Sequence, residues 1–141
     1  MPQTEIGTSD RLLAELRSWV EHETPTTDAA AVNRLIGRAE AELRAVGAAI
    51  ERIPGRDGLG DCAVLHAGAD NDRPAMLVVT HVDTVHPVGT LAGALPVRRD
   101  GDRLYGPGAY DMKGGIYLAL MAFRDVARLG AATGRPIRFL L

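Results

Sequence analysis

A short apolar run that ends in a histidine constrains the fold of this chain more than any other feature. Residues 75–80 read Ala-Met-Leu-Val-Val-Thr, a continuous apolar segment rich in β-branched side chains. Such a run is typical of a strand buried on both faces of an α/β sheet. The run passes directly into His81-Val82-Asp83, so two polar residues follow the strand at its carboxyl end. Open α/β sheets bind ligands at that edge, and the segment therefore predicts a fold class and the place of a site.

The rest of the chain alternates helical and extended patterns. Apolar residues at helical spacing predict one helix from a Thr8 or Ser9 N-cap to about Glu23, and a second from Asp28 to Gly47. The other predicted elements are strands at 48–53, 61–66 and 136–141, a hairpin at 97–105 around Asp100-Gly101, and a helix at 112–129. The strands at 48–53 and 61–66 are separated by turn signals and are expected to pair as a hairpin. The sequence therefore predicts an α/β protein.

The charge balance and the termini exclude several classes of protein. The chain has 141 residues, with 16 Lys and Arg against 18 Asp and Glu and a formal net charge of −2. Intermixed charges of both signs offer no basic surface to nucleic acid or to anionic lipid. A signal segment and an apolar run of membrane-spanning length are both absent from the sequence. We therefore expect a cytoplasmic protein.

His81 and Asp83 have the spacing of a metal-binding histidine and the carboxylate that orients it. In an extended chain, residues i and i+2 point to the same side. Asp83 can therefore accept a hydrogen bond from the ring nitrogen of His81 that does not face a metal ion. The alternative is a hydrogen-bonded histidine beside a capping aspartate, with no metal ion involved.

Asp111 lies on a glycine-lined turn that enters a predicted helix, within Gly-Pro-Gly-Ala-Tyr-Asp-Met-Lys-Gly-Gly at residues 106–115. Glycine permits close approach of another group to the backbone, and a carboxylate at such a place can bridge two metal ions. The alternative is that Asp111 only caps the helix. Lys113 is the single lysine of the chain and is expected to be a solvated residue of the first helical turn.

The remaining candidate residues give weaker signals. His86 lies on the loop after the histidine strand and would either line a substrate entrance or be a plain exposed loop residue. His22 and His66 are far from both motifs in sequence and are expected at the surface or at strand ends. Cys62 is the only cysteine, which excludes an intrachain disulfide and a thiolate cluster. We expect it to be a small buried apolar side chain.

The two polar motifs together resemble those of a known enzyme family. His-Val-Asp-Thr-Val at residues 81–85 and Tyr-Gly-Pro-Gly-Ala-Tyr-Asp-Met-Lys-Gly-Gly at residues 105–115 are similar to the metal-site motifs of the two-zinc glutamate carboxypeptidases, acetylornithine deacetylases, succinyl-diaminopimelate desuccinylases and aminoacylases. The Gly-Thr at residues 89–90 and the Gly-Pro-Gly are more similar to the glutamate carboxypeptidase type. The resemblance runs from about residue 12 to residue 141 and covers only the first third of such an enzyme.

This resemblance implies a domain organisation. Residues 1–141 would be the N-terminal portion of a three-layer catalytic domain with a mixed, mostly parallel central sheet. The chain would stop before the catalytic Glu-Glu segment, and the lid and dimerisation domain would be absent. The full-length parent could then be a homodimer.

The resemblance also implies roles for three residues. By their positions in the motifs, His81 and Asp111 would be metal ligands, and Asp83 would be the catalytic-site residue that orients His81. The complete active site would hold two Zn²⁺ ions, with Co²⁺ or Mn²⁺ as substitutes, and the peptide bond after Asp111 would be cis. The motifs assign no substrate-binding residue.

The activity implied by the resemblance is that of a zinc metallopeptidase. Such a hydrolase cleaves an amide or peptide bond next to an amino acid carboxylate, in a C-terminal glutamyl peptide or an N-acyl amino acid. Its partner would be a small molecule or short peptide, with neither nucleic acid nor membrane. Since the general base is expected beyond Leu141, we expect the fragment alone to be inactive. The alternatives are a non-catalytic truncated relative and a deacylase of the acetylornithine or succinyl-diaminopimelate type.

Overall fold

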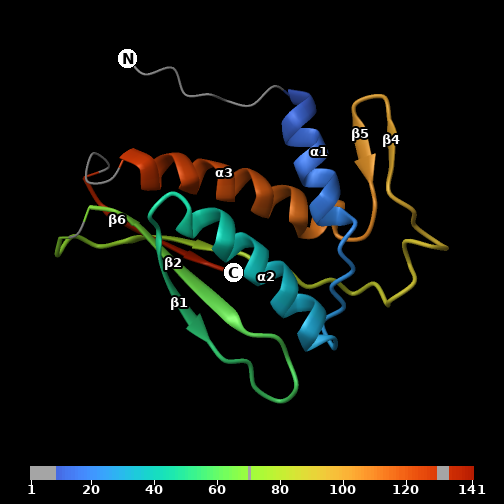
Figure 1. Ribbon diagram of the computed structural model, residues 1–141, viewed down its shortest axis with the longest axis horizontal. Coiled ribbons are helices and arrows are strands. Elements are labelled where there is room, and N and C mark those ends of the chain that lie inside the picture. The colour runs from blue at the N-terminus through green and yellow to red at the C-terminus, as the bar shows by residue number, and fades with distance from the viewer. Residues whose placement is uncertain (1–8, 70, 130–133) are drawn as a thin grey trace.

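The computed structural model describes residues 9–69, 71–129 and 134–141 (Figure 1). The elements in chain order are α1 (Ser9–Val20), α2 (Ala29–Arg44), β1 (Ala49–Ile53), β2 (Cys62–Gly68), β3 (Met76–Val79), β4 (Arg98–Asp100), β5 (Arg103–Tyr105), the irregular turn η1 (Ala109–Lys113), α3 (Gly114–Leu129) and β6 (Pro136–Leu140). Among the residues described, no helix is both long and apolar enough to cross a membrane. The alternative N-cap predicted at Thr8 lies outside the described residues.

Four strands form a mixed sheet in the order β1-β2-β6-β3. β6 pairs with β3 in parallel, whereas β1 with β2 and β2 with β6 are antiparallel. The predicted α/β class and the mixed sheet are confirmed, although two of these three described pairings are antiparallel. α2 and α3 cover one face of the sheet (Figure 1), so the described residues form two layers, one of helices and one of strands.

The core lies between these two layers. α2 begins as the sequence predicts, because the Asp28 side chain accepts a hydrogen bond from the backbone N–H of Ala31 at 2.9 Å. Its apolar stripe then faces the sheet, as expected for an amphipathic helix. The large, almost fully buried apolar side chains come from three helices and two strands: Trp19, Leu35, Ile36, Leu43, Leu65, Ile116, Tyr117, Leu120, Phe123 and Phe139. Packing of this apolar set fixes the sheet against the helices.

β3 differs from the prediction of a strand buried on both faces. Leu77 is 64% exposed and Val79 is 60% exposed. β3 is the edge strand of the described sheet, and the side chains of Leu77 and Val79 point to the face that the described helices do not cover. Only Val78, between them, packs against the core. The apolar run therefore forms a strand, but one that is half exposed in this chain.

Three element boundaries also differ from those predicted. α1 ends at Val20 because the residues that follow turn to run beside residues 82–84. α3 starts at Gly114 because Asp111 and Met112 have non-helical backbone angles. In the predicted hairpin, Asp100 pairs with Arg103, so the turn residues are Gly101 and Asp102. Gly101 has a φ of +61°, which glycine adopts without strain.

Candidate metal centre

His81 lies directly beyond the carboxyl end of β3. Thr80 closes the strand, since both its backbone N–H and its hydroxyl donate to the carbonyl of Leu140, at 3.0 and 2.9 Å. The chain then alternates: Val82 is 3% exposed and packs in the core, while His81 and Asp83 are on the opposite, accessible side. The buried Val82 thus anchors a segment whose two flanking polar side chains are free to meet other groups.

The structure brings His81, Asp83 and Asp111 together. The His81 Nδ1 atom is 3.2 Å from Asp83 Oδ1 and 3.1 Å from the Asp83 carbonyl oxygen. On the other side of the ring, Nε2 is 3.0 Å from Asp111 Oδ1. The imidazole is therefore held between two carboxylates, one from the loop after β3 and one from η1.

These carboxylates set the protonation of the ring. Partial burial alone would lower the pKa of His81, but the hydrogen bonds with Asp111 and Asp83 outweigh it, and the net pKa is raised. Each carboxylate favours the charged imidazolium. A metal ion that entered between Nε2 and Asp111 would have to displace a proton.

Close packing of two loops places Asp111 opposite His81. Gly108 has a φ of +70°, and a Cβ atom there would be 2.6 Å from the methyl carbon of Thr84. Only glycine lets the η1 turn approach the loop after β3 so closely. The peptide bond between Asp111 and Met112 is cis, as the resemblance implies. The Lys113 backbone N–H donates to the carbonyl of Gly108 at 2.8 Å and closes the turn.

Lys113 is buried, which corrects the expectation of a solvated lysine. Its side chain is fully buried, and its ammonium group donates to the backbone carbonyl of His22. Burial lowers its pKa to about 8, although the nearby Glu23 carboxylate opposes that shift. Lys113 thus ties the end of α1 to the turn that carries Asp111. Its position two residues after Asp111 was the only sign of this in the sequence.

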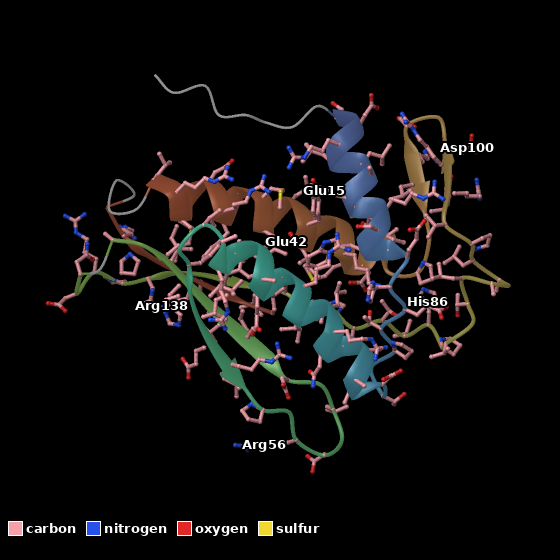
Figure 2. The ribbon with its side chains drawn as sticks, in the orientation of Figure 1. Glu15, Glu42, Arg56, His86, Asp100 and Arg138 are labelled. Carbon is pink, nitrogen blue, oxygen red and sulfur yellow. The ribbon has the colours of Figure 1, made fainter. Side chains whose placement is uncertain are left out.

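His86 lies beside this group. A cleft of about 300 Å³ is lined by His81, Asp111, His86, Val85, Leu95 and Tyr110. His86 lines this cleft and is half-buried, and a place at a substrate entrance stays a prediction. A larger hollow of about 430 Å³, which includes His66 and Arg138, lies on the sheet face that the described helices leave uncovered. Figure 2 shows Arg138 and His86 at opposite ends of the molecule, so that hollow is remote from the histidine and aspartate group.

Two other expectations are corrected. Cys62 is exposed, because its side chain points to the uncovered face of the sheet rather than into the core. His22 is remote from both motifs in sequence but not in space, since its carbonyl accepts the hydrogen bond from Lys113. Both depend on long-range contacts that residue spacing does not reveal.

The donor set suits a metal ion but is incomplete in the residues described. Among them, no group of three or more His, Cys, Asp or Glu side chains could hold a metal ion. His81 Nε2 and Asp111 Oδ1 supply one nitrogen and one oxygen, 3.0 Å apart. Ligand atoms about 2.0–2.1 Å from a tetrahedral zinc ion lie roughly 3.3 Å apart, so this pair could share one ion with little movement. Asp83 behind the ring matches the carboxylate–histidine–metal arrangement.

Comparison with known proteins is consistent with this geometry. Residues 77–141 match the peptidase family M20/M25/M40. Carboxypeptidase G2 of Pseudomonas sp. (strain RS-16) is 34% identical over 119 residues, which are 84% of this chain and 28% of that protein. A putative succinyl-diaminopimelate desuccinylase of Mycobacterium tuberculosis H37Rv is 43% identical over 91 residues, which are 63% of this chain and 23% of that protein. The chain thus spans about a quarter of the length of these curated relatives.

Solved structures show the same fold. Human carnosine dipeptidase 1 superposes with a TM-score of 0.70 at 22% identity, over 93% of this chain and 31% of that one. A Zn-dependent exopeptidase from Parabacteroides distasonis gives a TM-score of 0.61 at 20% identity, over 94% of this chain and 45% of that one. At these identities the solved structures show the fold alone. The sequence matches relate the chain to peptidase family M20/M25/M40 and confirm the resemblance inferred from its motifs.

Proposed function

We propose that this chain carries part of the metal site of a zinc-dependent hydrolase that cleaves an amide or peptide bond next to an amino acid carboxylate. The observation that carries the proposal is the approach of His81 Nε2 to Asp111 Oδ1 at 3.0 Å, with Asp83 on the other ring nitrogen. The family match at residues 77–141 covers all three residues. The description of one structural neighbour as Zn-dependent supports zinc as the metal ion.

Each of the three residues has a distinct task in this proposal. His81 offers the Nε2 lone pair, and Asp83 keeps the proton on Nδ1 so that Nε2 stays available. Asp111 offers carboxylate oxygens, and the second oxygen allows it to bridge a pair of ions. Zinc, when bound, would lower the pKa of a water molecule and polarise the scissile carbonyl. The cleft at His86, Val85 and Tyr110 would admit the substrate.

The substrate class is proposed from the relatives and the motifs. Carboxypeptidase G2 supports a C-terminal glutamyl peptide or an N-acyl amino acid. The succinyl-diaminopimelate desuccinylases, one of them 43% identical, support deacylation of a succinylated amino acid as a second candidate. In both reactions an amide bond is hydrolysed beside an amino acid carboxylate. We propose that residues 1–141 alone are inactive, because only two donor side chains converge at the described site and a general base is needed for turnover.

Two preparations test the proposal. The protein expressed from the complete reading frame is incubated with Zn²⁺ and assayed on N-acyl amino acids, C-terminal glutamyl peptides and succinyl-diaminopimelate; residues 1–141 are assayed in parallel. We expect metal-dependent release of an amino acid from the complete protein only, and loss of that release in its Asp111→Asn variant. Hydrolysis that is unaffected by a chelator or by Asp111→Asn would overturn the proposal. Turnover by residues 1–141 would overturn the claim that the fragment is inactive.

A further inference from the structure

The segment between α1 and α2 runs alongside the residues that follow β3 (Figure 1). Pro25 forms a parallel bridge with Thr84. The Thr84 backbone N–H donates to the carbonyl of Thr24 at 2.7 Å, and the Thr26 N–H donates to the carbonyl of Thr84 at 3.1 Å. Residues 24–26 therefore act as a short extra strand that is paired with the segment carrying Asp83.

Thr24 and Thr26 both form side-chain hydrogen bonds with residues 82–84, but they bond to different groups. Thr24 is fully buried, and its hydroxyl donates to the backbone carbonyl of Val82 at 2.8 Å. Thr26 is exposed, and its hydroxyl oxygen is 2.5 Å from Asp83 Oδ2. Thr24 thus holds the backbone of the loop, whereas Thr26 holds the side chain of a single residue, Asp83.

The hydroxyl of Thr26 has one proton and two acceptors within reach. The Asp83 Oδ2 atom is at 2.5 Å, and the Thr84 carbonyl oxygen is at 3.3 Å. The shorter distance and the negative charge both favour donation to Asp83, because hydrogen bonds to ionised acceptors are shorter and stronger. The other Asp83 oxygen, Oδ1, faces His81 Nδ1 at 3.2 Å. Each carboxylate oxygen therefore has its own partner.

We propose that Thr26 is a positioning residue that orients Asp83 toward His81 and so keeps His81 Nε2 directed at Asp111. The proposal rests on the proposed function, because it assumes that Nε2 binds a metal ion. A carboxylate held at one oxygen only can rotate about its side-chain torsions, and the ring it orients then loses its fixed direction. Partners beyond the direct ligands can change metal affinity by about tenfold or more.

Three variants separate this role from a structural one. Thr26→Val keeps the side-chain shape and removes the hydroxyl, and Thr26→Ser restores the hydroxyl. Thr27→Val makes the same change at the neighbouring exposed threonine and serves as the matched control. Thermal unfolding of all three is expected to stay within a few degrees of the wild type, since both positions are exposed.

The first measurement needs no metal ion. In NMR spectra of the metal-free chain, the Nδ1 proton of His81 is expected to give a downfield, slowly exchanging signal that reports its hydrogen bond to Asp83. Thr26→Ser and Thr27→Val should retain the signal, and Thr26→Val should lose it or shift it upfield. A Thr26→Val spectrum that matches the wild type would overturn the proposal, and so would a wild type that lacks the signal.

The second measurement is a Zn²⁺ titration of the protein expressed from the complete reading frame and of its variants. We expect Thr26→Val to bind Zn²⁺ about tenfold more weakly than the wild type, and Thr26→Ser and Thr27→Val to bind within twofold of it. Equal affinity of Thr26→Val and wild type would overturn the proposed effect on metal binding. If the wild type binds no Zn²⁺ although Thr26→Val alters the Nδ1 signal, the positioning of Asp83 stands and the proposed function fails.

Discussion

The helix-covered core and the loops around His81 differ in how they are held. In the core, Phe139, Leu65 and Tyr117 are at most 1% exposed and are held by packing from several directions. In the two loops that carry His81 and Asp111, these side chains are 46% and 79% exposed. Hydrogen bonds from Thr24, Thr26 and Lys113 fix these loops instead.

This contrast indicates that the core provides the stability of the fold, whereas the loops around His81 provide the groups for metal binding. Burial of large apolar side chains contributes most of the free energy of folding, and that burial lies between the sheet and α2 and α3. The exposed carboxylates and imidazole contribute little to it, so they can be arranged for metal binding. A change in the core should therefore leave metal binding largely intact, and a change in the loops around His81 should leave the free energy of unfolding largely intact.

The largest effect on stability is expected in the core. Phe139 packs edge-to-face on Phe123, with 5.7 Å between the ring centroids. Phe139→Ala should lower the free energy of unfolding by about 3–5 kcal/mol, because it removes a buried ring and leaves a cavity. Urea unfolding followed by circular dichroism measures the change. Phe139→Leu fills more of the space, so it should lower the free energy of unfolding by less than Phe139→Ala and should bind Zn²⁺ like the wild type. Weakened Zn²⁺ binding by the folded leucine variant would show that core packing and metal binding are not independent.

An intermediate effect is expected at the polar contact of the core. The Tyr117 hydroxyl donates to the Glu15 carboxylate, and this bond is the main reason that the pKa of Glu15 is lowered. Tyr117→Phe should lower the free energy of unfolding by about 1–2 kcal/mol at pH 7.

The effect of Tyr117→Phe should depend on pH. A carboxylate whose pKa is lower in the folded state stabilises the fold above its unfolded value of about 4.5, and this contribution is lost as the pH falls. The difference between variant and wild type should therefore shrink below pH 4.5. Unfolding curves at pH 7 and pH 3.5 test this, with the exposed Tyr110→Phe as control. A difference that grows on acidification would contradict the assignment.

The smallest effect on stability is expected at Asp111. Its exposed side chain contacts the His81 ring, so Asp111→Asn should change the free energy of unfolding by less than about 0.5 kcal/mol. The same substitution should weaken Zn²⁺ binding at least about tenfold, since it removes the charged ligand. Urea unfolding and a Zn²⁺ titration on one preparation check both statements. A loss of 2 kcal/mol, or unchanged Zn²⁺ affinity, would show that the two regions are not separable in this way.

Local signals in the sequence predicted most of the fold. The Asp28 cap located the start of α2, and the turn signals after β1 located its hairpin with β2. The family resemblance of the motifs also implied that His81 and Asp111 share one site, and the structure brings the two side chains within 3.0 Å of each other. These features depend on residues that are close in sequence or on a shared pattern.

The sequence did not reveal features that depend on distant contacts. Lys113 is buried because the end of α1 covers it, and Thr26 reaches Asp83 because residues 24–26 pair with residues 82–84. Cys62 and Leu77 are exposed because the described helices lie on the other face of the sheet. Apolar character alone does not tell which face of a strand is covered.

The pairing of residues 24–26 with residues 82–84 has a consequence for the order of folding. The bond from Thr24 to Val82 joins residues 58 positions apart, and the bond from Lys113 to His22 joins residues 91 positions apart. Each closes a long loop, which costs more chain entropy than a helix turn or the β1–β2 hairpin. On the ribosome, the first contact cannot form before Val82 has been synthesised, and the second cannot form before Lys113 has been synthesised. The ability to hold a metal ion should therefore arise late, after the local elements are already in place.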